Sequence, residues 1–218
     1  GIYGFTFYGI LNYLGKKKYI DFSKLKSIHA TSIGSIISVM SLLELDWDIT
    51  ENYMINRPWK EILQINLRDV LNIYKNAGLY NKENIIKFLI PFFKLHDLDI
   101  YTITVLDFYK YTNTDMYIYI TNVSKFEYEA IHWKTHPSWK LIDALFASCS
   151  VPIIFQPFYC NTTKCYYADG GLFMNYPLEP CIDICQKGEE DLDTIFGINQ
   201  LAEKNTIQNS SFSLAEYM

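Results

Sequence analysis

Two short segments contain side chains that could carry out covalent chemistry together. Ser32 lies in the stretch Ala30–Gly34, which has a small residue two positions before the serine and another two positions after it. Small neighbours let a strand and a helix approach closely, so this spacing is typical of a serine held on a sharp strand-to-helix turn. Far downstream, Asp169 is followed by Gly170 and Gly171. A carboxylate on such a turn could accept the proton of a serine hydroxyl, so we expect a serine nucleophile with an aspartate base.

Histidine is the usual base for a serine nucleophile, and the chain has four. In the α/β-hydrolase order the histidine comes after the acid, but no histidine follows Asp169. The chymotrypsin and subtilisin orders place it before the serine, where only His29 stands. Three residues along a strand would not bring His29 round to Ser32. We therefore expect all four histidines to be surface or core residues.

These two turns must be positioned by the elements around them. Apolar patterning predicts a strand at 25–30 that enters the serine turn, a helix at 35–45 that leaves it, and a short strand at 166–168 that runs into Asp169. Alternation at 116–122 predicts a further strand. We also expect helices at 4–14, 63–74, 82–93 and 139–147 and a last strand at 195–198. Strands interleaved with helices indicate a layered α/β fold with a mostly parallel central sheet flanked by helices.

The composition limits the classes of partner. The chain has 218 residues, half of them hydrophobic, which is enough for one globular domain with a sizeable core. A net charge of −5 without a long basic run argues against nucleic acid, while a membrane surface stays open as a partner. No apolar run reaches the roughly 18 residues of a membrane span. We expect an intracellular, cytoplasmic protein that is compatible with peripheral attachment to membranes.

The cysteines favour reduced thiols. Their number, five, is odd, and neither the pair Cys160 and Cys165 nor the pair Cys181 and Cys185 has the two-residue gap of a zinc knuckle. We expect small buried residues at these positions, and neither a metal nor a cofactor.

The two segments, in this order, resemble the patatin-like phospholipases over nearly the whole chain. The flanking stretches at 143–157 and 175–177 also match the family pattern, and 78–80 is a weaker match. The resemblance implies a three-layer α/β fold, formed by a single domain over residues 1–218. It also implies a catalytic dyad of Ser32 and Asp169 that hydrolyses a lipid acyl ester, a phospholipid or a neutral lipid, through an acyl-enzyme.

In this family a glycine-rich loop supplies the oxyanion hole. Gly1 to Gly4 align with the end of that loop, so the first strand and the start of the loop are expected upstream of residue 1. The resemblance implies that backbone amides of Gly1, Ile2, Tyr3, Gly4 and Ile33 hold the oxyanion. It implies that the turns are supported by Ala30, Gly34, Gly170 and Gly171.

Some residues depart from the family pattern and leave a second interpretation open. Ala30 stands where glycine is usual, Tyr3 replaces a basic residue, and Phe146 stands where the family often has arginine. These changes fit a weak or inactive relative that binds lipid or protein, whereas the intact Ser32 and Asp169 favour an enzyme. The apolar stretches 92–93 and 153–155 are candidates for an acyl channel or for core packing.

Overall fold

The computed structural model describes residues 4–43, 46–59 and 77–200 of the chain. The helices are α1 (Gly4–Lys16), α2 (Ile33–Leu42), α3 (Trp47–Asn56), α6 (Lys82–Lys94), α7 (Val105–Thr112), α8 (Leu141–Cys149) and α9 (Leu178–Lys187). Three short 3-10 turns are η1 (Phe22–Lys24), η2 (Gly170–Leu172) and η3 (Leu192–Thr194). The strands are β1 (Ser27–Thr31), β2 (Gly78–Tyr80), β3 (Asp115–Asn122), β4 (Glu127–Ile131), β5 (Ile153–Phe155), β6 (Phe158–Cys160) and β7 (Cys165–Asp169).

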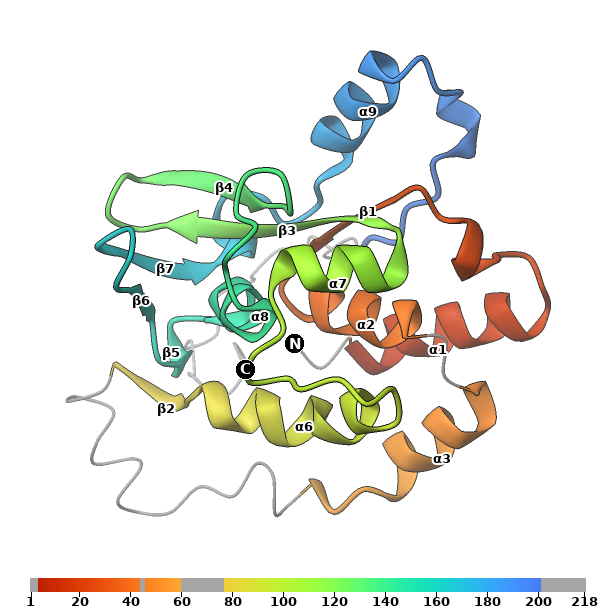
Figure 1. Cartoon of the computed structure of the whole chain (residues 1–218), viewed down its shortest axis with the longest axis horizontal. Helices are drawn as coiled ribbons and strands as arrows, with labels where there is room; N and C mark the ends of the chain where they lie inside the picture. The colour runs from red at the N-terminus through yellow and green to blue at the C-terminus, as the bar shows by residue number, and fades with distance from the viewer. Residues whose placement is uncertain (1–3, 44–45, 60–76, 201–218) are drawn as a thin grey trace, which may run out of the picture.

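The elements form layers around the main sheet. In Figure 1, α9 lies on one side of the sheet, and α2 and α8 lie on the other, with α6 and α3 beyond them. This arrangement confirms the predicted layered α/β fold. Among the described residues, no helix combines the length and the hydrophobicity needed to cross a bilayer.

Strand β3 is the centre of the main sheet and brings two other strands end to end. Residues 115–119 of β3 pair with β1, and residues 120–122 pair with β7. Strand β4 pairs with residues 118–122 of β3, so it must occupy the opposite edge. Strands β1 and β7 therefore lie along one edge, and their carboxyl ends meet there, because Thr31 pairs with Tyr119 and Asp169 with Ile120.

The strand directions are more mixed than the mostly parallel sheet that we expected. The pairs β1–β3 and β2–β5 are parallel, whereas β3–β4, β3–β7 and β6–β7 are antiparallel. The physical reason is that short turns at 123–126 and 161–164 join neighbouring strands, and such turns cannot connect parallel strands. Residues 195–200 form no strand, so the expected strand at 195–198 is absent. The helix expected at 63–74 lies outside the described residues.

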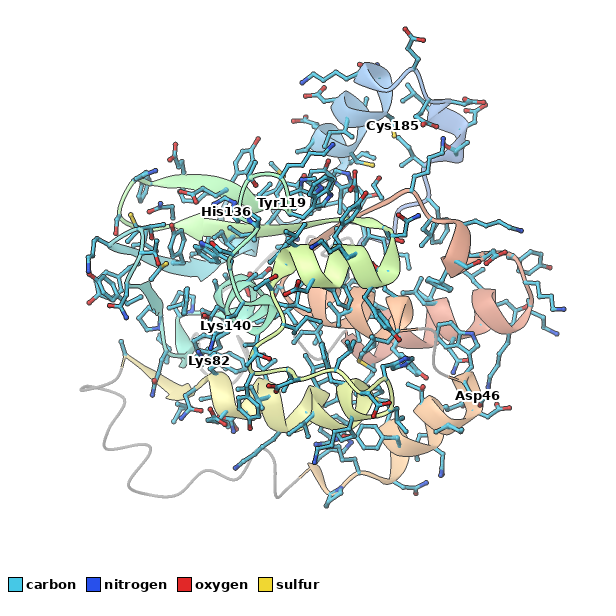
Figure 2. The ribbon with its side chains drawn as sticks, in the orientation of Figure 1. Asp46, Lys82, Tyr119, His136, Lys140 and Cys185 are labelled. Carbon is cyan, nitrogen blue, oxygen red and sulfur yellow. The ribbon has the colours of Figure 1, made fainter. Side chains whose placement is uncertain are left out.

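Helix α8 forms the middle of the core. Every residue of α8 except Asp143 is buried, and the helix contacts β3, β7, α2 and α6. Lys82 begins α6, as Figure 2 shows, and its Nζ lies 2.6 Å from Asp143 Oδ1, which joins α6 to α8. Phe92 and Phe93 are buried in the same core, so core packing is their role. Helix α8 is therefore packed between the sheet and α6.

Candidate active site

The turn between β1 and α2 holds Ser32 in a strained backbone conformation. Its φ is 53° and its ψ is −132°, a region that residues with a side chain rarely adopt. Such conformations typically cost about 1–3 kcal/mol and persist where the surrounding structure enforces them. Ser32 is the N-cap residue of α2, yet its side chain makes no capping hydrogen bond to the helix. The hydroxyl is therefore free to point elsewhere.

The hydroxyl of Ser32 points at Asp169. Ser32 Oγ donates a hydrogen bond to Asp169 Oδ2 at 2.5 Å, across 137 positions of sequence. The topology explains this contact, because the two residues lie at the carboxyl ends of β1 and β7, which meet on the edge of β3. The structure thus brings together the two side chains that the sequence selected.

Hydrogen bonds hold both the side chain and the backbone of Asp169. Its second carboxylate oxygen, Oδ1, accepts the N–H of Gly171 at 2.7 Å. Its own N–H donates to the Ser150 carbonyl at 2.9 Å, and its carbonyl accepts from Thr121 Oγ1 at 2.8 Å. These bonds fix the backbone and engage both carboxylate oxygens, so the carboxylate keeps its orientation toward Ser32.

Burial gives Asp169 the character of a stronger base. Asp169 is only 6% exposed, and burial raises its pKa above the ordinary value of 3.8. Hydrogen bonds from Ser32 and from the Gly171 N–H oppose this rise in pKa. A carboxylate with a raised pKa binds a proton more tightly, which favours proton transfer from a hydroxyl.

The small residues beside the two turns have different roles. A Cβ on Gly170 would lie 2.2 Å from the Tyr119 carbonyl oxygen, so the backbone of the aspartate turn needs glycine to pass β3. A Cβ on Gly171 would lie 2.9 Å from Asp169 Oδ1. A Cβ on Gly34 would meet no atom of the described residues within 4 Å, so the close approach expected there stays a prediction. Within the described part of the chain, a tight contact lies at η2, where it passes β3.

The predicted oxyanion loop is described only at its end. Gly1, Ile2 and Tyr3 lie outside the described residues. Gly4 is buried at the start of α1, and a Cβ on it would lie 2.4 Å from Cγ1 of Ile33. Its backbone therefore lies against the first residue of α2. The Ile33 N–H belongs to the first turn of α2, where amides have no acceptor within the helix and the helix dipole favours negative charge.

The histidines bond to other partners. His29 Nδ1 lies 2.9 Å from the hydroxyl of Tyr119, and burial lowers the pKa of His29 to about 4. His132 is buried and stacks on Tyr117 at a centroid distance of 4.0 Å. The other two bond to Tyr111 and Thr135. None of these contacts is with the serine turn.

The end of α8 contributes residues that the sequence reasoning missed. Ser148 Oγ accepts the N–H of Ser32 at 2.9 Å and donates to the Tyr119 carbonyl at 2.7 Å. Cys149 is buried, and its pKa is raised first by burial and then by the negative charge of Asp169. Ser148 lies in the stretch 143–157 that matches the family pattern, but no turn or glycine beside it marks a contact with Ser32, 116 positions away.

Two of the departures that favoured an inactive relative are core residues. Phe146 is 4% exposed and packs edge-on against Phe155 and Phe158. Ala30 is 5% exposed within β1. A shallow surface cavity of about 590 Å³ lies between Asp97 and Tyr111, away from Ser32, and we assign it no role.

Comparison with known proteins adds the family. The sequence profile described as patatin-like phospholipase matches residues 1–182. The chain belongs to the patatin-like phospholipase family. This patatin-like chain is 26% identical over 185 residues to the "Probable lipid hydrolase 463L" of Invertebrate iridescent virus 6, covering 84% of the chain. It is 50% identical over 38 residues, 17% of the chain, to the "cGAMP-activated phospholipase" of Escherichia coli (strain TW11681).

A solved structure shares the patatin-like fold. VipD from Legionella pneumophila matches over 79% of this chain with a TM-score of 0.53 and 14% sequence identity, which shows the fold alone. The patatin-like chain spans 62% of the virus protein, 11% of the E. coli phospholipase and 44% of VipD.

Proposed function

We propose that this chain hydrolyses lipid acyl esters with Ser32 as nucleophile and Asp169 as general base. The observation that carries the proposal is the hydrogen bond of 2.5 Å between Ser32 Oγ and Asp169 Oδ2, made by a hydroxyl on a strained strand-to-helix turn. The nucleophile and its base are within hydrogen-bonding reach, and the base is itself oriented by Gly171 and Ser150.

In the proposed mechanism Asp169 accepts the proton of Ser32 as Oγ attacks the ester carbonyl. The tetrahedral oxyanion collapses to an acyl-enzyme, and Asp169 returns the proton to the leaving alcohol or lysolipid. Asp169 then takes a proton from water, which attacks the acyl-enzyme, and it returns this proton to Ser32 Oγ as the fatty acid leaves. The same carboxyl thus acts as base and then acid in each of the two half-reactions.

The amides that stabilise the oxyanion come from two elements in this proposal. The N–H of Ile33 starts α2, whose positive end favours a developing negative charge. The amides of Gly1, Ile2, Tyr3 and Gly4 provide the second set. The Ser32 N–H is not among them, because it donates to Ser148.

The substrate class rests on the family and on the names of its relatives. One relative is described as a probable lipid hydrolase and another as a phospholipase. We propose a phospholipid or a neutral lipid, taken up from a membrane surface. The proposed reaction needs neither a metal nor a cofactor, because the carboxylate of Asp169 supplies the base.

The test uses the full-length protein with a short-chain p-nitrophenyl ester, followed by phosphatidylcholine and triacylglycerol. We expect hydrolysis by the wild type and its loss, by about 10³-fold or more, in both Ser32→Ala and Asp169→Asn. Ser41→Ala and Asp193→Asn serve as matched controls, because the Ser41 hydroxyl donates to Ile37 of its own helix and Asp193 is exposed.

The outcomes separate the alternatives. Activity that survives in Asp169→Asn would refute the dyad. A folded wild type that binds lipid vesicles but hydrolyses none of the three esters would instead support the inactive, lipid-binding relative.

A further inference from the structure

The end of α8 touches the serine turn through one buried hydroxyl. Ser148 is 0% exposed and bonds both to the turn between β1 and α2 and to β3. Its Oγ is 2.9 Å from the Ser32 nitrogen and 2.7 Å from the Tyr119 carbonyl oxygen. The hydroxyl therefore connects the backbone of the turn to the backbone of the sheet.

Ser148 lies beside the point on β3 where the pairing with β1 ends and the pairing with β7 begins. Thr31, the last residue of β1, pairs with Tyr119, and the next position of β3 pairs with Asp169 from β7. The Tyr119 carbonyl faces this point, since a Cβ on Gly170 would lie 2.2 Å from its oxygen. The Ser148 hydroxyl bridges the Ser32 N–H and the Tyr119 carbonyl, in place of a direct bond between the two backbones.

The hydrogen-bond roles of this hydroxyl are unambiguous. A serine hydroxyl has one proton to donate, and the Tyr119 carbonyl can only accept, so the proton lies toward Tyr119. The lone pairs of Oγ then accept the Ser32 N–H. Because both neighbours are main-chain groups, the hydroxyl cannot reverse its roles without losing both bonds.

We propose that Ser148 is a positioning residue that holds Ser32 in its strained conformation and so aims Oγ at Asp169. Without the Ser148 hydroxyl, the partly buried Ser32 N–H loses its acceptor, and the backbone of the turn relaxes from its φ of 53°. Relaxation moves Oγ away from Asp169, and small misplacements of a reacting atom can cost about 10²-fold in rate. This inference rests on the proposed function of Ser32.

The experiment compares Ser148→Ala, Ser148→Thr and Ser41→Ala in the full-length protein. For Ser148→Ala we expect a fall of about 10- to 100-fold in kcat, with KM within about 2-fold, because the ester-binding surface is unchanged. The labelling rate of Ser32 by a fluorophosphonate should fall in parallel. Ser148→Thr keeps the hydroxyl and should recover most of the lost rate.

Ser41→Ala controls for the loss of a buried hydroxyl. Ser41 is 4% exposed on α2 and donates to the Ile37 carbonyl, so its removal costs stability without touching the turn. Melting followed by circular dichroism gives the folded fraction of each variant, and rates are compared per folded molecule. Equal kcat and labelling rates in Ser148→Ala and Ser41→Ala would overturn the positioning role. A wild type that neither hydrolyses esters nor labels at Ser32 would overturn the proposed function, and this inference with it.

Discussion

At the scale of single residues, the strain at Ser32 predicts a difference between two inactive variants. Ser32→Ala and Ser32→Gly both lack the hydroxyl, but only glycine adopts a φ of 53° with a ψ of −132° readily. Part of the gain is lost, because glycine also increases the entropy of the unfolded chain. We expect Ser32→Gly to be more stable than Ser32→Ala by about 1 kcal/mol, measured by urea unfolding. Equal stability would show that the strain at Ser32 is no larger than the entropy cost of glycine, about 0.4–1 kcal/mol.

The pH dependence of hydrolysis is a second prediction at this scale. Asp169 must be ionised to accept a proton, and burial raises its pKa above 3.8. Activity should therefore fall as the pH drops through the raised pKa of Asp169 and level off above it. A kcat/KM profile measured from pH 3 to 9, in buffers of constant ionic strength, checks this.

His29→Gln is the control for the fall of kcat/KM at low pH, the acidic limb of the profile. His29 has a pKa of about 4 and bonds to Tyr119, so we expect the limb to stay in place when it is replaced. A limb that bends at or below pH 3.8 would contradict the effect of burial on Asp169. A limb that shifts in His29→Gln would indicate a histidine base.

At the scale of elements, the contact between η2 and β3 decides where Asp169 lies. A Cβ at Gly170 would lie 2.2 Å from the Tyr119 carbonyl oxygen, and main-chain atoms cannot move aside as a flexible side chain can. We expect Gly170→Ala to lower the free energy of unfolding by about 3 kcal/mol and to reduce kcat sharply. Thermal melting and ester hydrolysis measure the two effects.

Gly9→Ala is the matched control for Gly170→Ala. Gly9 lies within α1, and a Cβ there meets no described atom within 4 Å. Because alanine is the better helix former by about 1 kcal/mol, this variant should be as stable as the wild type or slightly more stable. Equal melting temperatures for Gly170→Ala and Gly9→Ala would contradict the close contact between η2 and β3.

Side chains close in sequence cap the starts of two helices. The sequence analysis predicted neither α7 nor α3. The N-cap residue of α7, Thr104, shares reciprocal hydrogen bonds of 3.1 Å with Asp107, and Asp46 caps α3 through its side chain. Capping bonds of this kind join residues two or three positions apart, so they depend on local sequence alone. The antiparallel pairing of β6 with β7 is not predicted, because the sequence analysis expects a strand at 166–168 and none at the position of β6.

At the scale of the whole molecule, α8 links the core to the site. Leu145 is 0% exposed between the sheet and α6, and the same helix ends at Ser148 and Cys149. We expect Leu145→Ala to lower the free energy of unfolding by about 3 kcal/mol and Leu95→Ala, at a side chain that is 65% exposed, by less than about 0.5 kcal/mol. Equal melting temperatures for the two variants would contradict the central place of α8 in the core.

The sequence by itself determined the chemical identities and the local turns: a serine between small residues and an aspartate before two glycines. These features depend on contacts between near neighbours, which spacing records. Only the tertiary structure decided that β1 and β7 meet end to end on β3, that burial raises the pKa of Asp169, and that Ser148 bridges Ser32 to Tyr119. Such contacts join residues far apart in the chain, and they exist only once the layers have packed.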